Sequence, residues 1–256
     1  MSSTAPSKRE QPAKSLPTGK GLFDWLKPVL ASTVGGKFLV ALTGLALVGF
    51  VIAHMAGNLQ IFLGPDVINE YAKKLKDLGP LLWTMRIGLL VVFVIHIALA
   101  VRLSLLSNAA RPIGYAHKQT VQASIASRTM MYSGLVILAF TLFHLAHYTF
   151  GSFPITDTDG VTKSVFELKD RLGRHDVYRM MILGFENPIM ALLYIVAQLI
   201  LMLHLSHGIA STFQTLGWNT PRLQSTWRYL GWGITLLVGG GNIAIVVAVW
   251  LGMLPK

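Results

Sequence analysis

Four histidines inside long apolar stretches are the residues of this sequence most able to do chemistry. They are His54, His96, His144 and His204. A titratable side chain costs free energy in hydrocarbon and tends to mark function there. Imidazole is both a common metal ligand and a proton carrier near neutral pH. A single such histidine is ordinarily a hydrogen-bonded residue between helices, so only the arrangement of all four can indicate binding.

The composition is that of a protein that crosses a membrane several times. The chain has 256 residues, a mean hydropathy of +0.56 and only 13% charged residues. The absence of cysteine excludes disulfides, cysteine-ligated iron–sulfur clusters and covalently attached c-type haem in this chain. We predict an all-α fold, an integral membrane bundle of five helices in residues 37–256, after a polar cytoplasmic tail with a possible interfacial helix in residues 1–36. The expected spans are about 38–63, 81–106, 129–151, 187–213 and 229–254.

Positive charge is concentrated on one side of these spans. If the N-terminus is inside, the inner segments carry twelve Lys and Arg against two acids, Glu10 and Asp24, whereas the outer segments are nearly balanced. The positive-inside rule then predicts an N-in, C-out topology. The net charge of +11 therefore reflects topology, and we expect no nucleic-acid partner.

This topology places the four histidines at two depths. His54 follows Lys37 by 17 residues and His144 follows Arg128 by 16, so both lie roughly 24–26 Å from the inner ends of their helices. His96 and His204 are on helices of the opposite direction and fall toward the inner half. The result is two pairs of imidazoles, each from two helices, stacked across the membrane.

Paired neutral imidazoles in an apolar bundle are suited to ligating haem iron from both sides. A six-coordinate haem has no open position, so such a protein would carry electrons rather than bind oxygen. Three alternatives stay open: a haem-free structural anchor, a proton-relay transporter and a histidine metal site. A transporter typically uses buried acids, which the predicted spans lack in their interiors, and a metal site would need its ligands at one depth.

Four segments, one around each of the four histidines, form a distinctive set. The segments are HMAGNLQIFLG (His54–Gly64), HIALAVRLSLLSNAARPIGY (His96–Tyr115), FHLAHYTFG (Phe143–Gly151) and LHLSHGIASTFQTLG (Leu203–Gly217). Together they resemble the five-helix, di-haem cytochrome b subunit of succinate:quinone oxidoreductases, the family of bacterial succinate dehydrogenases and fumarate reductases. The resemblance covers about residues 35–254. It implies two haems b, the distal one ligated by His54 and His144 and the proximal one by His96 and His204.

The resemblance also implies a role and partners. The chain would be the quinone-reactive electron-transfer subunit of the complex in the bacterial cytoplasmic membrane, serving the respiratory chain and the tricarboxylic acid cycle. A flavoprotein holding FAD and an iron–sulfur protein would dock on its cytoplasmic face, membrane lipid would surround it, and its substrate would be a quinone, menaquinone. One branch of the family has a glutamate close before the last haem histidine. Here Leu201, Met202 and Leu203 precede His204, which departs from that branch and its transmembrane proton movement.

Two of the histidine motifs contain a second histidine three residues later. The resemblance favours His204 over His207 and His144 over His147, which leaves His147 and His207 as neighbours of the haems. Another di-haem quinone cytochrome, such as the nitrate-reductase type with two haem histidines on one helix, stays an alternative. Histidines three residues apart, however, lie only about 4.5 Å apart along a helix axis.

The quinone site is expected near the distal haem. A quinone needs hydrogen-bond donors in an apolar slot, and Asn58, Gln60 and His147 are the candidates there. Glu70 or Asp77 could move protons. The ordinary role of each is structural, and the sequence leaves open whether succinate is oxidised or fumarate reduced.

Overall fold

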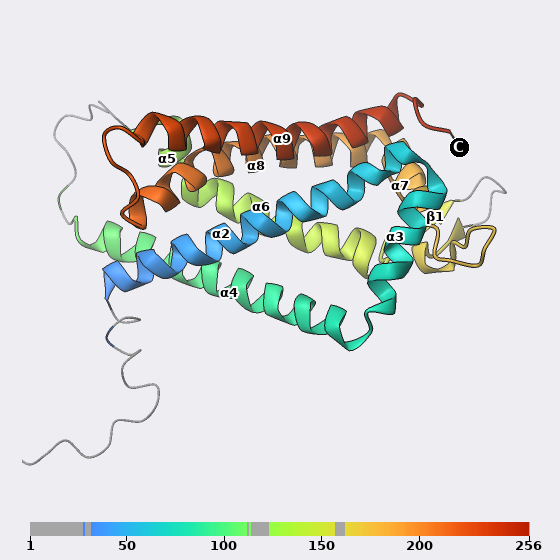
Figure 1. Ribbon diagram of the computed structural model, residues 1–256, viewed down its shortest axis with the longest axis horizontal. Helices are drawn as coiled ribbons and strands as arrows, with labels where there is room; N and C mark the ends of the chain where they lie inside the picture. The colour runs from blue at the N-terminus through green and yellow to red at the C-terminus, as the bar shows by residue number, and fades with distance from the viewer. Residues whose placement is uncertain (1–27, 29–31, 112, 114–122, 157–161, 256) are drawn as a thin grey trace, which may run out of the picture.

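The computed structural model describes residues 28, 32–111, 113, 123–156 and 162–255 and is almost entirely helical. The predicted all-α fold with five long apolar helices is confirmed, and these helices run roughly along one axis (Figure 1). Most of the expected tail and interfacial helix lies outside the described residues. The five helices are α2 (Thr33–Asn58, continued by the 3-10 helix η1, Leu59–Leu63), α4 (Pro80–Ala109), α6 (Met130–His144, continued by the π-helical turn η2, Leu145–Thr149), α8 (Pro188–Thr215) and α9 (Gln224–Trp250).

Local signals in the sequence set where these helices begin. The Ser32 side chain accepts a hydrogen bond from Gly35 N at 2.9 Å and caps α2. Pro80 and Pro188 occupy the first turns of α4 and α8, where the N–H that proline lacks has no helical partner. Asn187 caps α8 by accepting from the first free backbone N–H groups.

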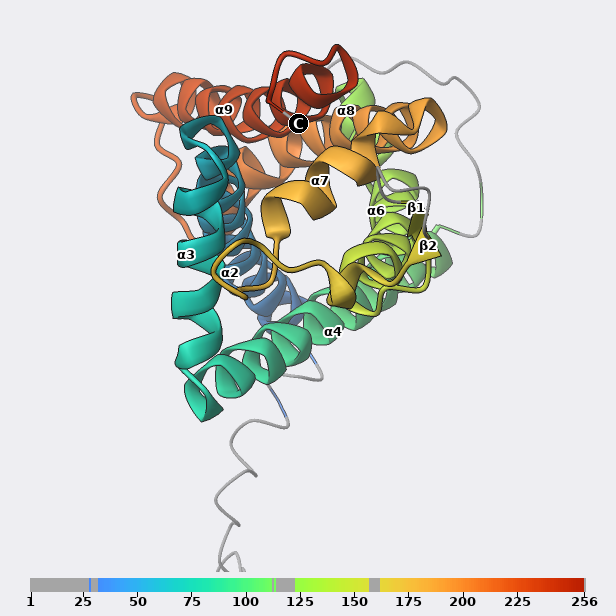
Figure 2. The same cartoon turned by 90° about the vertical axis from the view of Figure 1, so that its right-hand side faces the viewer.

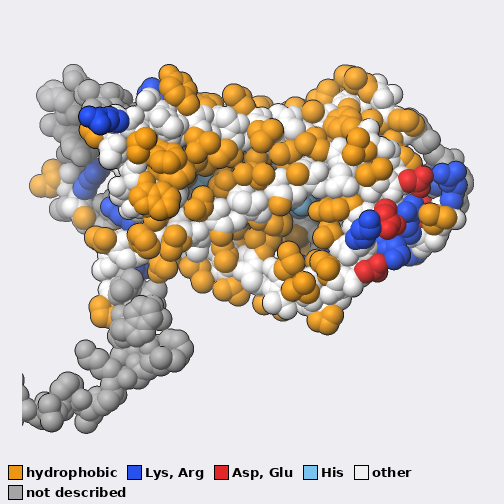
Figure 3. Space-filling view, in the orientation of Figure 1, with side chains coloured by type: hydrophobic (Ala, Val, Ile, Leu, Met, Phe, Trp, Pro, Cys, Tyr) orange, Lys and Arg blue, Asp and Glu red, His pale blue; other side chains and the backbone are white. Residues whose placement is uncertain are grey.

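The exterior of the bundle is that of a membrane protein. Large apolar side chains cover its long flank, whereas charged side chains gather near the two ends (Figure 3). Each of the five helices is long and apolar enough to cross a bilayer. Seen along the axis, the helices stand around a centre, with α4 along one edge and α7 (Val177–Glu186) crossing in front (Figure 2).

Helix α9 carries no histidine and supports the others. It packs most extensively on α8, where Gly239 lets the backbone approach so closely that a Cβ there would overlap Met202. Small residues allow this close approach between membrane helices. A polar pair joins the same two helices, because Asn242 Nδ2 donates to Gln198 Oε1 at 3.2 Å.

One end of the bundle is closed by a cap, which we define as α3 (Pro65–Asp77) together with the segment between α6 and α8. Helix α3 is amphipathic and begins directly after η1, with Pro65 in its first turn. The segment after α6 contains the antiparallel strands β1 (Ile155–Thr156) and β2 (Thr162–Lys163), followed by the 3-10 helix η3 (Val165–Glu167). Sequence reasoning missed α7, which buries Tyr178, Met181 and Phe185 against α8 and α9. The end opposite the cap carries the short helix α5 (Ile125–Arg128).

Candidate functional site

The four predicted histidines each come from a different helix and meet in two pairs. His54 on α2 and His144 at the end of α6 lie toward the cap. His96 lies near the middle of α4 and His204 in the second half of α8, close enough to interact electrostatically. The pairs are those that depth along the helices predicts.

The two histidine rings nearer the cap lie close together with nearly perpendicular planes. The ring centres of His54 and His144 are 5.8 Å apart, with their planes at 86°. Two imidazoles that ligate one metal ion from opposite sides have ring centres roughly 6 Å apart, since each metal–nitrogen bond is about 2 Å. The His54 ring also stacks on Phe50 at 5.4 Å and 20°. The spacing and chemistry of this pair therefore fit axial ligation of haem iron.

The orientation of His96 is set by a threonine on the neighbouring helix. Thr43 Oγ1 donates its proton to the Leu39 carbonyl at 2.7 Å, so the oxygen must accept from His96 Nδ1, 3.1 Å away. A neutral imidazole carries one proton, and placing it on Nδ1 leaves a lone pair on Nε2, the atom that can ligate a metal. Gly44 makes room for this ring, because a Cβ there would lie 3.2 Å from His96 Cε1.

His204 has the same arrangement with a serine. Ser133 Oγ donates to the Met130 carbonyl at 3.0 Å and therefore accepts from His204 Nδ1 at 3.1 Å. Gly134 follows, and a Cβ on it would lie 3.5 Å from His204 Cε1. Both imidazoles of this pair thus present an unprotonated Nε2, as ligands of haem iron must.

The four histidines remain accessible within the bundle. His54 is exposed, and His96, His144 and His204 are partly exposed, although all four lie on membrane-spanning helices. Histidine atoms are visible through openings in the apolar flank (Figure 3), and α4 contributes no buried residue along its whole length. His147, by contrast, is 2% exposed. None of the four paired histidines is therefore fully enclosed by protein, in contrast to His147.

Tyr194 on α8 is a site residue that sequence reasoning missed. Its hydroxyl lies 3.2 Å from His144 Nδ1 and 3.0 Å from His147 Nδ1, and the side chain is 5% exposed. π-Helical turns are often found at functional sites, and η2 here carries His147 directly after His144. The signal available in the sequence was a tyrosine inside a predicted span, one helix away from the HLAH motif.

A cavity of about 200 Å³ opens beside His54, between α2 and α3. Asn58 is the predicted quinone-binding candidate that lines it, and Tyr71 adds a hydroxyl that sequence reasoning missed. Gly57 permits the close approach of Tyr71, because a Cβ there would lie 2.9 Å from its ring. The lining residues are His54, Gly57, Asn58, Ile68, Tyr71, Ala72, Leu75 and Val177.

Other predicted candidates lie elsewhere. Gln60 is half-buried on η1 and is not among the residues lining the cavity. His147 is buried and hydrogen-bonded to Tyr194. His207 is partly exposed, one turn from His204 on α8.

Glu70 and Asp77, the predicted proton carriers, belong to ion pairs of the cap. Arg174, 10% exposed, donates to Asp170, Asp66 and Glu70 at 2.6, 2.9 and 3.1 Å. Asp77 pairs with Lys73 at 2.6 Å. Burial acts to raise the pKa of Asp170, but the hydrogen bonds from Arg174 outweigh it and hold that pKa below its ordinary 3.8. These residues tie the segment after α6 to α3.

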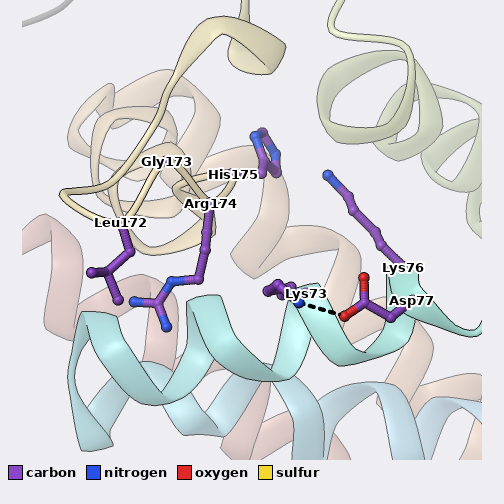
Figure 4. Close-up of a pocket in the computed structure, with 7 residues that line it drawn as sticks. All are labelled: Lys73, Lys76, Asp77, Leu172, Gly173, Arg174 and His175. Carbon is purple, nitrogen blue, oxygen red and sulfur yellow. Dashed lines mark hydrogen bonds and ion pairs between the residues drawn. The ribbon is translucent and has the colours of Figure 1, made fainter.

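Lys73, Asp77 and Arg174 also line a second cavity, of about 250 Å³, on the cap (Figure 4). Lys73 points toward Asp77, one turn further along α3, and the hydrogen bond between them raises the pKa of Lys73. The Lys73–Asp77 pair lies within α3, whereas Arg174 joins α3 to the segment after α6, so this cavity lies where the two parts of the cap meet. The remaining lining residues are Lys76, Leu172, Gly173 and His175.

Comparison of the chain with protein-family models, with curated proteins and with solved structures found no match. Within the described residues, no group of three or more His, Cys, Asp or Glu could hold a metal ion. The two histidine pairs are therefore the candidate ligand sets in the part of the chain that the structure describes.

Proposed function

We propose that the chain is the di-haem cytochrome b membrane anchor of a succinate:quinone oxidoreductase. The observation that carries the proposal is the pairing of four accessible histidines from four helices, with the proton of His96 and of His204 held on Nδ1 by a hydroxyl. A structural histidine has no need of a free Nε2, whereas a haem ligand depends on it.

Each residue of the proposed sites has a separate task. His54 with His144, and His96 with His204, would hold the iron inside the apolar bundle. Thr43 and Ser133 orient the second pair. Bound haem supplies one-electron chemistry, and two sites at different depths give electrons a route across the membrane.

The spacing along two helices supports two separate haem sites. Thr43 precedes His54 by 11 residues on α2, and Ser133 precedes His144 by the same number on α6. At 1.5 Å per residue, this separates the two levels by about 16 Å along each helix.

The charge distribution supports N-in, C-out orientation in a bacterial cytoplasmic membrane, with the cap outside. The partner subunits, a flavoprotein with FAD and an iron–sulfur protein, would then dock at the α5 end, near the His96–His204 site. The cavity beside His54 is the proposed site for a quinone, menaquinone, at the other level. Asn58 and Tyr71 offer it hydrogen-bond donors in a largely apolar lining.

Haem quantification on the purified protein tests the proposal. We expect two b-type haems per chain by pyridine haemochrome and reduced-minus-oxidised spectra. His204→Ala should lose one haem and quinone-linked turnover. His207→Ala, a matched change one turn away, should keep both haems. Two haems retained in His204→Ala would contradict the ligand assignment, and a folded wild-type protein without haem would favour a structural helix bundle.

A further inference from the structure

The structure places two histidines against one hydroxyl, and that hydroxyl has only one proton. His144 at the end of α6 and His147 in η2 both direct Nδ1 at Tyr194 Oη, at 3.2 and 3.0 Å. The hydrogen bonds of the described residues give the Tyr194 proton no other acceptor. The hydroxyl must therefore donate to one Nδ1 and accept from the N–H of the other. The two neutral rings are thus in opposite tautomers, one with a bare Nε2 and one with Nε2–H.

Packing identifies which ring has which tautomer. His144 faces His54 at 5.8 Å with perpendicular planes, and it is partly exposed within the bundle. His147 is 2% exposed and stacks on Tyr148 at 4.1 Å and 24°. A free lone pair on Nε2 can bind a ligand on the accessible His144 ring, whereas the enclosed His147 ring has no access to one. We propose that Tyr194 is a positioning residue that accepts from His144 Nδ1 and donates to His147 Nδ1, and so leaves the lone pair on His144 Nε2.

The other site explains why His147 is needed. There Ser133 gives its proton to a carbonyl of its own helix, that of Met130, and its oxygen is left to accept from His204. The hydroxyl of Tyr194, at the end of a long aromatic side chain, lies too far from its own helix to donate its proton to a backbone carbonyl there. His147 takes the Tyr194 proton in place of that carbonyl. The second histidine, three residues after His144, therefore has a physical role: it accepts the Tyr194 proton and so frees the Tyr194 oxygen to accept from His144.

The effect of Tyr194 on a haem potential rests on the proposed function. The assignment of the two histidine tautomers does not depend on it. A histidine ligand that donates its second N–H is a more basic ligand, and a more basic ligand favours ferric over ferrous iron. Loss of the Tyr194 oxygen should therefore raise the midpoint potential of the His54–His144 haem. The His96–His204 haem, held by Thr43 and Ser133, should not shift.

Tyr194→Phe is the variant that tests this inference, because it removes one oxygen and keeps the ring that packs on Phe140 and Phe185, each at 5.0 Å. The matched control is Ser133→Ala, which removes the corresponding oxygen at the other site. Two measurements are made on the full chain. One is ¹⁵N NMR of histidine-labelled protein, which distinguishes Nδ1–H from Nε2–H rings. The other is a redox titration of both haems, followed by EPR of the ferric protein.

We expect opposite tautomers for His144 and His147 in the wild type, lost in Tyr194→Phe. We also expect Tyr194→Phe to raise the midpoint potential of the His54–His144 haem, and Ser133→Ala to raise that of the His96–His204 haem. His147→Leu should shift the same haem as Tyr194→Phe, because it deprives Tyr194 of its acceptor. Identical tautomers in the wild type, or unchanged ¹⁵N signals and potentials in Tyr194→Phe, would overturn the inference. A haem-free chain that still showed opposite, Tyr194-dependent tautomers would refute the proposed function and leave this inference standing.

Discussion

At the scale of single residues, a hydroxyl that donates its own proton to a backbone carbonyl holds the histidine proton on Nδ1 and leaves Nε2 free, as the proposed haem ligation requires. Thr43→Val tests this at His96, because valine has the shape of threonine without the oxygen. It leaves the His96 Nδ1–H without its partner, and loss of such outer hydrogen bonds typically weakens metal binding about 10–100-fold. We expect haem to leave the His96–His204 site faster in a competition with a haem-scavenging apoprotein. Equal loss of both haems would contradict the assignment.

The hydroxyl residues that hydrogen-bond to the histidines could not be predicted from the sequence, whereas the histidines themselves could. His54, His96, His144 and His204 stand out because a titratable group in an apolar span is rare and its depth follows from counting residues. Thr43 and Ser133 are unremarkable in sequence, since Ser and Thr in membrane helices commonly bond their own backbone. Their role depends on which face of one helix meets the next, and that is decided by packing between helices.

At the scale of elements, α2 and α6 are built alike. Each carries a hydroxyl and a glycine, and 11 residues after the hydroxyl comes a histidine of the other site. Eleven residues make about three whole turns of helix, so the hydroxyl and the histidine lie on the same face. Each helix therefore contributes to both histidine pairs with one face: its hydroxyl contacts a histidine of one pair, and its own histidine belongs to the other pair.

Gly44→Val tests this shared face. A Cβ at Gly44 would already lie 3.2 Å from the His96 ring, and the larger valine has to displace that ring. We expect the loss of one haem of two, with the fold retained, measured by haem content and circular dichroism. Gly49→Val on the same helix is the control, because a Cβ there meets nothing within 4 Å. Loss of haem from both variants would indicate a general effect of valine on α2.

The cap should depend on pH through Asp170. Its pKa lies below the ordinary 3.8 in the folded protein, so the unfolded state binds a proton first as the pH falls. The ionised carboxylate thus stabilises the fold at pH above about 4, and this contribution is lost as the pH falls through the lower folded pKa. Asp170→Asn should lower the unfolding temperature at pH 7 and reduce the further drop near pH 3, measured by thermal unfolding in detergent. An unchanged unfolding temperature at pH 7 would mean that the Arg174 contacts do not hold the cap.

At the scale of the whole molecule, the long helices were predictable and the cap was only partly so. Five apolar runs of membrane length define their own helices, and α3 shows the helical period of its apolar residues. Helix α7 is only ten residues long and follows a charged segment. Its apolar residues, such as Met181 and Phe185, become a pattern only once α8 and α9 are present to bury them. Short elements of this kind depend on the tertiary structure more than on local sequence.

The orientation of the whole molecule decides which site faces which partner. The chain has no cysteine, so a single introduced cysteine reports on one position without background. Leu172→Cys lies on the cap, where the leucine is 72% exposed, and Gln224→Cys lies at the start of α9, at the opposite end. If the cap is outside, as the positive-inside rule predicts, a membrane-impermeant maleimide should label Leu172→Cys in intact cells and Gln224→Cys only after the membrane is opened. The reverse labelling would place the His54–His144 level near the cytoplasm and would move the proposed docking face of the iron–sulfur partner to the cap. In the proposed function, the orientation therefore also decides which of the two histidine levels lies nearer the iron–sulfur partner and would receive electrons first.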